Sequence, residues 1–292
     1  MISILIPNYN TSIYELVKTL HSEATNLNIA FEICVCDDAS TLYRTENNRI
    51  QQLSNCHFFQ HENNKGRTFT RDFLANKATY ETLLYLDADV MPTQANFIAT
   101  YLNIFPNHKQ IIVGGYNYRD DFHPSQSFRW TFGKQRESIS AKTRNVTPYK
   151  YVFSGNFLIS KQTYIQLSLP KENLYGMDLL FSKALYENQI EVIHINNTID
   201  HLGLESNDVF LNKSLEAVEL RYLYRNSLET PFEAKYQKLK AFKLHYLFYK
   251  TTQKLTPLFL ANLCSKKPNM FVFDLYRLGY YCKLHLEEKE SL

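Results

Sequence analysis

The sequence lacks the cysteine patterns of disulfide-rich and zinc-binding chains. Its cysteines are odd in number and scattered, and no Cys-x-x-Cys or His-x-His accompanies them, which excludes the usual zinc spacings. They are Cys34, Cys36, Cys56, Cys264 and Cys282. We therefore expect them to be small buried residues of a protein in a reducing compartment.

Long apolar runs, repeats and low-complexity tracts are missing as well. No charged region precedes an apolar stretch at the N-terminus, because strand-like residues begin at Ile2, so we expect no signal peptide. No apolar run approaches the ~18 residues of a membrane-spanning helix. A hydrophobic content of 45% and a charged content of 21% are typical of globular proteins. A cytoplasmic protein is the default expectation.

The first 120 residues alternate between strand and helix patterns. Strands are predicted at 2–6, 31–36, 56–59, 82–86 and 111–116, and helices at 12–20, 45–53, 67–78 and 93–105. Such alternation predicts an α/β fold with a mostly parallel sheet flanked by helices. Ligands bind such sheets beyond the carboxyl ends of the strands.

The pattern changes twice in the rest of the chain. Residues 121–150 are polar and irregular. Strands are then predicted at 157–160 and 191–195, the second of which is expected to be the last, and helices at 162–168 and 178–186. Residues 208–229, 233–250 and 270–287 are all helix-like. Residues 221–292 hold 13 Lys and Arg against 6 Asp and Glu, whereas residues 1–220 hold 19 against 23. These shifts predict a domain at 1–205 and a helical, basic and aromatic extension at 206–292.

Two carboxylates, Asp87 and Asp89, flank Ala88 directly after the apolar run 83–86. Like charges at a strand end are unfavourable unless a cation neutralises them, and Mg²⁺ takes one or two carboxylates together with substrate phosphates. The alternative is a capping turn before a helix that opens at Thr93.

Other polar residues stand at neighbouring strand ends. Asp37-Asp38-Ala39-Ser40 offers carboxylates to a nucleobase N–H or ribose hydroxyls, with an ordinary Asx turn as the alternative. The loop 63–67 enters a helix that carries Arg71, and helix N-termini and arginines suit phosphates. A solvated basic face is the alternative there.

In this order, the motifs resemble the family 2 glycosyltransferases of bacterial type, which have the GT-A fold. The resemblance covers about residues 1–205 and rests on Ser3–Asn10, Asp37–Ser40, Asn64–Arg67 with Arg71-Asp72, and Leu86–Asp89. Asp72 stands where the family usually has Asn. The resemblance implies a nucleotide-sugar half at 1–120 and an acceptor half at 121–205.

The resemblance also implies roles for single residues. Asp38 would contact the base, Arg71 the base or diphosphate, Asp87 the ribose or metal, and Asp89 the metal. The nucleotide-sugar site as a whole would comprise Pro7, Asn8, Tyr9, Asp38, Gly66, Arg67, Arg71, Asp87 and Ala88. The donor would carry a uridine or guanosine diphosphate, with UDP preferred.

The acceptor half offers a base and a further metal ligand. Phe153–Ile159 resembles the strand that lines the sugar pocket, and Tyr175–Leu180 is similar to a Gly-x-Glu-Asp-x-x-Leu pattern whose Asp is the catalytic base. Asp178 matches that Asp, while Met177 replaces the Glu; Asp178 as a helix N-cap is the alternative. His201 matches a position where related enzymes often bind metal or diphosphate, with a structural role as the alternative.

The C-terminal extension interleaves lysines with aromatic residues, as in Lys243–Lys250. Packing on the first domain is one interpretation, and contact with an anionic membrane surface, at its cytoplasmic (inner) face, is the other. No nucleic-acid recognition motif accompanies the stripe, so we expect no nucleic-acid partner.

Together these features predict an inverting, metal-dependent glycosyltransferase of the hexosyltransferase class. Mn²⁺ or Mg²⁺ would be held by Asp89, Asp87 and His201, and Asp178 would activate a hydroxyl of a glycan or lipid-linked acceptor in polysaccharide or glycan assembly. A sugar-nucleotidyltransferase is one alternative, although its glycine-rich phosphate loop is absent at Pro7–Asn10. A non-catalytic nucleotide-binding or scaffold relative that lost the Glu at position 177 is the other.

Overall fold

A computed structural model describes residues 1–104, 109–170 and 174–290. The chain divides into two compact units. The first comprises Met1–Arg119, Arg136–Asn173 and Asp178–Gly203, and the second Asp120–Gln135, Leu174–Met177 and Leu204–Leu292. The expected division of the chain into 1–205 and 206–292 stays a prediction.

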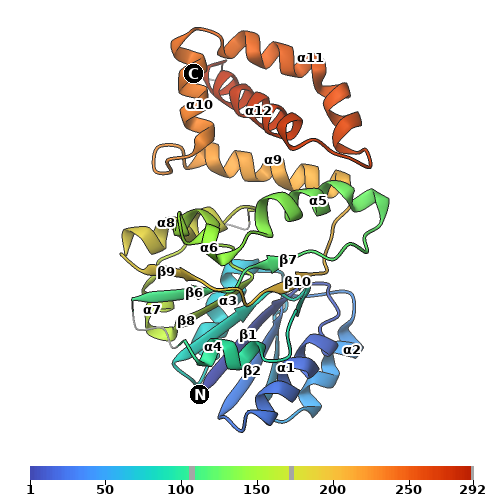
Figure 1. Ribbon diagram of the computed structural model, residues 1–292, viewed down its shortest axis with the longest axis vertical. Coiled ribbons are helices and arrows are strands. Elements are labelled where there is room, and N and C mark those ends of the chain that lie inside the picture. Colours follow the sequence, from blue (N-terminus) through green and yellow to red (C-terminus); the bar gives the residue numbers. More distant parts are fainter. Residues whose placement is uncertain (105–108, 171–173, 291–292) are drawn as a thin grey trace. The chain divides into compact units, whose positions relative to one another are not determined.

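A seven-stranded sheet forms the centre of the first unit (Figure 1). Its strands are β1 (Ile2–Asn8), β2 (Phe31–Asp37), β3 (Cys56–Gln60), β4 (Thr82–Leu86), β6 (Gln110–Val113), β8 (Asn156–Ser160) and β9 (Glu191–His194), in the order β3-β2-β1-β4-β8-β6-β9. Only β8 runs antiparallel to its neighbours, β4 and β6. The predicted fold class, a mostly parallel sheet flanked by helices, is confirmed.

Helices cover both faces of this sheet, and for that reason its central strands are apolar along most of their length. Leu5, Cys34 and Tyr85 belong to one buried cluster. That cluster includes residues from α3 (Arg67–Lys77), α7 (Lys161–Gln166) and α8 (Asp178–Glu187). The alternate positions Ile4 and Val35 point to the opposite face. There α1 (Tyr14–Asn26) packs against β2 and α4 (Phe97–Leu102) (Figure 1).

Shorter helical segments complete the first unit. They are α2 (Arg44–Asn48), α6 (Ala141–Arg144) and the 3₁₀ turns Arg49–Gln52 and Pro148–Tyr151. The five cysteines are free. Cys34, Cys36 and Cys282 are buried as expected, whereas Cys56 is half-buried and Cys264 is exposed, so the expectation was wrong for these two.

A second sheet of three very short strands corrects the sequence prediction. It consists of β5 (Val90–Pro92), β10 (Ile199–His201) and β7 (Tyr116–Asn117), in that order. The helix predicted at 93–105 is therefore shortened to α4, and its expected end at residue 105 lies outside the described residues. The strand predicted at 111–116 is divided into β6 and β7 because Gly115 adopts a φ of +93°. The strand at 191–195 is not the last, since β10 follows it.

The second unit is helical. Its helices are α5 (Ser127–Phe132), α9 (Asn207–Leu223), α10 (Pro231–Ala241), α11 (His245–Leu263) and α12 (Met270–Glu290). Phe128, Phe210 and Phe273 form one core that joins α5, α9 and α12. None of the helices in the described part of the chain is long and apolar enough to span a membrane.

Two further predictions were wrong in detail. The stretch 121–150 is not irregular throughout, because α5 and α6 lie within it. The helix predicted at 233–250 is two helices, α10 and α11, because Lys243 adopts a left-handed conformation (φ 60°) between them.

Candidate functional site

Three polar strand ends meet at one edge of the large sheet. Strands β2, β1 and β4 are adjacent and parallel, so their carboxyl ends point the same way. Asn8 at the end of β1 is paired in register with Asp37 at the end of β2, and its Nδ2 donates a hydrogen bond to Asp37 Oδ1 at 3.0 Å. Asp87 follows β4 directly.

Asp37 is a structural residue of this edge. Its carboxylate accepts hydrogen bonds from the backbone N–H of Ser40, at 3.1 Å, and from the Ser40 hydroxyl. This bonding within the turn gives Asp37 the structural role that the sequence allowed as the alternative. Pro7 lies half-buried within β1, whereas Tyr9 beyond the strand is 53% exposed and faces solvent.

Asp38 closes the loop that leads into α3. It accepts hydrogen bonds from the backbone N–H groups of Lys65 and Gly66, both at 2.8 Å, and lies 2.9 Å from His61 Nδ1. Gly66 has a φ of 87°, a conformation that strains most side chains. Both carboxylate oxygens of Asp38 therefore already accept hydrogen bonds from this loop. Its role as a base contact stays a prediction.

Asp87 lies between two arginines of α3. Arg67 Nη2 contacts both of its carboxylate oxygens at 2.8 Å, and Arg71 Nη2 donates to Oδ1 at 2.9 Å. The two arginines share a helix face because they are four residues apart. Burial raises the pKa of Asp87, but the charges of Arg67 and Arg71 outweigh it and hold that pKa below its usual value. The carboxylate is thus ionised and neutralised by the protein itself.

Ser154 connects these arginines to the proposed base, and sequence reasoning did not single it out. Arg71 Nη1 donates to Ser154 Oγ at 2.7 Å, and Arg71 also donates to the Ser154 carbonyl oxygen. The Ser154 hydroxyl in turn donates to Asp178 Oδ1. Asp178 is the first residue of α8, where a carboxylate also interacts favourably with the helix N-terminus. The structure brings Asp87, Arg71, Ser154 and Asp178 into one hydrogen-bonded chain.

Gly155 allows this close packing. Asp87 N donates to the Gly155 carbonyl oxygen at 3.0 Å. A Cβ at Gly155 would lie 1.7 Å from Tyr116 Oη and 2.3 Å from Asp87 Oδ2. Tyr116 Oη itself donates to Asp87 Oδ2 at 3.3 Å. Tyr116 and Gly155 are therefore parts of the site to which the sequence analysis assigned no individual role.

Asp89 faces a histidine instead of the arginines. The antiparallel pairing of His201 with Val90, together with the hydrogen bond from Leu202 N to Asp89 O at 2.8 Å, places the two side chains side by side. His201 Nε2 lies 3.8 Å from Asp89 Oδ2. The imidazole stacks on Tyr118, with ring centroids 5.6 Å apart, and its Nδ1 is buried without a hydrogen-bond partner.

One carboxylate and one imidazole suit a divalent cation that takes its other ligands from phosphate and water. Ala88, between the two acids, is half-buried. Across residues 1–104, 109–170 and 174–290, no three His, Cys, Asp or Glu side chains are arranged to hold a metal by themselves. Asp87, the third predicted ligand, is engaged by the arginines.

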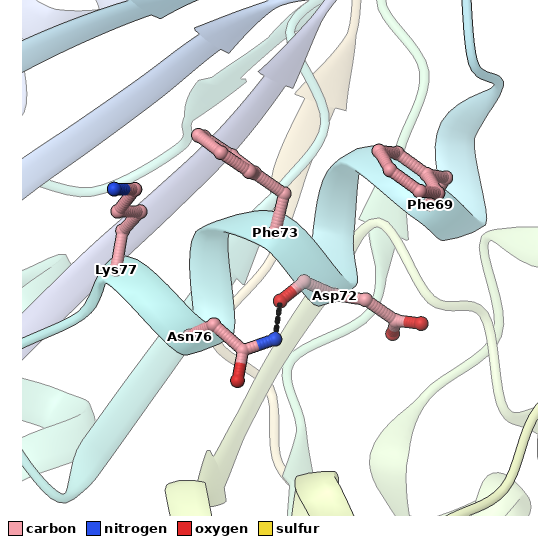
Figure 2. A pocket seen from close by; sticks show the side chains of 5 residues that line it. All are labelled: Phe69, Asp72, Phe73, Asn76 and Lys77. Atoms are coloured by element: carbon pink, nitrogen blue, oxygen red, sulfur yellow. Dashed lines mark hydrogen bonds between the residues drawn. The ribbon is translucent and has the colours of Figure 1, made fainter.

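A hollow of about 310 Å³ lies along a different face of α3. Figure 2 shows the side chains that line it, Phe69, Asp72, Phe73, Asn76 and Lys77. Arg67 and Arg71 are on the other side of the helix, so the hollow is not part of the carboxylate–arginine cluster. Asp72, the departure from the family pattern, lines the hollow and accepts a hydrogen bond from Tyr164 Oη at 3.1 Å. That departure leaves the cluster intact.

The solved structures most relevant to this fold share little sequence with the chain. S. aureus TarS 1-349 is 16% identical, with a TM-score of 0.54 over 100% of this chain and 92% of that one. A longer S. aureus TarS structure is 17% identical over 84% of this chain, which spans only 43% of its length. Glucosyl-3-phosphoglycerate synthase from Mycobacterium tuberculosis is 12% identical, with a TM-score of 0.52 over 79% of this chain and 80% of that one.

The sequence comparison is more decisive. No curated protein sequence matches the chain. The family model described as glycosyl transferase family 2 matches residues 3–162, which is more than half of the 292 residues and includes the strand ends at Asn8, Asp37 and Asp87. The sheet, the ordered motifs and this match agree, and the chain belongs to glycosyltransferase family 2.

Proposed function

We propose that the chain transfers a sugar from a UDP-sugar to an acceptor hydroxyl with inversion at the anomeric carbon. The observation that carries the proposal is the hydrogen-bonded chain from Asp87 through Arg71 and Ser154 to Asp178. It connects the cationic residues expected at the diphosphate with the carboxylate expected at the acceptor. The structures of S. aureus TarS 1-349 with UDP and with UDP-GlcNAc support a uridine donor.

Arg67 is the residue best suited to meet the diphosphate. Its side chain is 46% exposed, whereas that of Arg71 is 9% exposed and held by Ser154. A guanidinium matches phosphate oxygens with two parallel hydrogen bonds, as it does a carboxylate. Arg67 can therefore exchange one contact with Asp87 for a phosphate oxygen while Arg71 keeps Asp87 neutralised.

Asp178 is the proposed general base. As the acceptor oxygen forms a bond to the anomeric carbon, the bond from that carbon to the diphosphate oxygen breaks, and its electron pair leaves with the diphosphate. The hydroxyl proton passes to Asp178. Ser154 donates to one oxygen of that carboxylate and so leaves the other available for the acceptor.

Asp89 and His201 are the residues that would hold Mn²⁺ or Mg²⁺. Bound there, a divalent cation supplies charge neutralisation for the departing diphosphate. The structure of the M. tuberculosis synthase with Mn²⁺ and UDP supports this choice of cation. Asp87, which we expected to contact the ribose or the metal, would bind the cation only by releasing its contact with Arg67 or Arg71.

The acceptor is proposed to be a hydroxyl of a glycan or of a lipid-linked glycan, as in polysaccharide assembly. Hexosyl transfer remains the expected class. A nucleotidyltransferase is disfavoured, because the loop between β1 and α1 at residues 9–13 contains no glycine to cradle phosphates.

Purified full-length protein, Mn²⁺ and a panel of nucleotide sugars test the proposal. We expect release of UDP with one UDP-sugar and a thermal shift that is larger for UDP than for GDP in the presence of Mn²⁺. Asp178→Asn should lower turnover by roughly 10²–10⁴-fold and leave the UDP-induced shift unchanged. Glu187→Gln, at the exposed far end of the same helix, is the matched control.

Two outcomes would separate the alternatives. A chain that binds UDP with Mn²⁺ but turns over no donor would be a binding or scaffold relative, consistent with Met177 in place of Glu. Full activity in Asp178→Asn would remove Asp178 as the base.

A further inference from the structure

The turn between α10 and α11 presents large apolar side chains to solvent. We call residues 242–247 the hairpin tip. Within it, Phe242 is 76% exposed, Leu244 47%, Tyr246 56% and Leu247 62%. Four exposed large apolar residues within six positions form the kind of local patch that marks an interaction surface.

These side chains are not needed to pack the helices. In the core between α9, α10, α11 and α12, the residues from α10 and α11 lie outside the tip; they include Tyr236, Leu239, Phe248 and Tyr249. Tyr236 is buried and stacks on His285 with ring centroids 3.7 Å apart. The hairpin therefore has an inner aromatic side that packs in the core and an outer apolar side that is exposed to solvent.

The segment of sequence that carries the tip has charge of one sign, with Lys235, Lys238, Lys240, Lys243 and Lys250 nearest to the tip along the chain. Residues 234–273 contain eight lysines and no aspartate or glutamate. All eight are exposed, and no ion pair joins any of them to a carboxylate among the described residues. They are Lys235, Lys238, Lys240, Lys243, Lys250, Lys254, Lys266 and Lys267.

We propose that the hairpin tip docks on an anionic lipid bilayer. Phe242 and Leu247 would enter the headgroup region, Tyr246 would lie at the interface, and the lysines would contact lipid phosphates. A second copy of the chain is a poorer partner, because a twofold contact through the tip would bring together two copies of the segment 234–273, whose charged residues are all lysines. The proposal goes beyond sugar transfer and requires nothing of the donor site.

Vesicle co-sedimentation of the full chain tests the proposal. We expect binding to vesicles of phosphatidylcholine with phosphatidylglycerol and little binding to phosphatidylcholine alone. Phe242→Ser with Leu247→Ser should weaken binding at least tenfold. Lys240→Glu with Lys243→Glu should weaken it further, because each lysine near the surface contributes roughly fivefold. Added salt should reduce binding of the wild-type protein.

The controls are an exposed apolar residue and an exposed lysine of the first unit. Ile165→Ser replaces a side chain that is 52% exposed on α7, and Lys18→Glu reverses an exposed charge on α1. Both should bind vesicles as the wild type does. Phe242→Trp adds a direct reporter, whose fluorescence should shift to the blue with anionic vesicles.

Three results would overturn the proposal. They are equal binding to both kinds of vesicle, an equal loss in the controls and the tip variants, and an unshifted Phe242→Trp emission. Self-association of the wild type that the tip substitutions abolish, without vesicle binding, would assign the surface to a second copy instead.

Discussion

His194 gives the most quantitative test of how the first unit is held together. It ends β9, where its ring lies between Arg144 and the Pro148 carbonyl oxygen, 2.8 Å from Arg144 Nη1 and 2.9 Å from that oxygen. Burial, aided by the Arg144 charge, lowers the pKa of His194 from 6.5 to about 4. The imidazole is therefore neutral in the folded protein at pH 5, whereas it is largely protonated in the unfolded chain.

The sign of the pH dependence follows from these two values. Between about pH 6.5 and 4 the unfolded chain binds more protons, so the free energy of unfolding falls as the pH falls through this window. The full difference between the two pKa values corresponds to about 3 kcal/mol of unfolding free energy. About 2 kcal/mol of it is lost when the pH falls from 7 to 5. His194→Gln removes the titrating group and should remove that part of the slope.

Urea denaturation at pH 7 and pH 5 measures the effect. The quantity compared is the change in unfolding free energy between the two pH values, since the glutamine lowers stability at both. His123→Gln replaces an exposed histidine and should keep the wild-type slope. If His194→Gln loses as much stability between pH 7 and pH 5 as the wild type, the buried neutral histidine is not the cause.

Three further predictions concern the candidate site. Ser154→Ala removes the hydroxyl between Arg71 and Asp178 and should lower kcat by roughly 10–10²-fold with unchanged UDP binding; an unchanged kcat would contradict a positioning role. Gly155→Ala forces Tyr116 and Asp87 apart and should cost about 1–3 kcal/mol in urea denaturation; wild-type stability would show that the site tolerates a Cβ. Gly203→Ala places a Cβ 1.8 Å from Asp89 Oδ2, so it should displace the Asp89 side chain, cost about 1–3 kcal/mol in urea denaturation and weaken Mn²⁺-dependent UDP binding about tenfold by isothermal titration. Equal Mn²⁺ dependence in this variant would separate Asp89 from the metal.

The large sheet was predictable because its strands are apolar runs separated by helices of ordinary length. The predicted range for β4 is the observed one, and those for β1, β2 and β3 are within two residues. Strands β5, β7 and β10 were missed or merged, since two or three residues carry no period-two signal. They matter because β5 and β10 bring Asp89 to His201.

In the candidate site, sequence reasoning selected residues whose type is unusual at their position. Asp87 and Asp89 were selected at a strand end, and Arg71 on the helix that follows the loop 63–67. Ser154 and Tyr116 were not, because serine and tyrosine are common in loops and short strands, and their partners are far away in the sequence. The one available signal was the Ser-Gly pair before β8, where a residue without a side chain permits two polar groups to approach.

The two acids of Asp87-Ala88-Asp89 have different surroundings, and on that basis we propose a different role for each. The side chain of Asp87 is 16% exposed and neutralised by Arg67 and Arg71, so it requires no external cation. That of Asp89 is 34% exposed and lies beside His201, and no arginine or lysine of the described residues forms an ion pair with it. In the proposed reaction a carboxylate near the departing diphosphate is unfavourable unless it is neutralised, so we expect the second acid, and not the first, to require a metal. Loss of Asp89 should therefore abolish the effect of Mn²⁺ on UDP binding, whereas loss of Asp87 should release the arginines and disorder the link to Asp178.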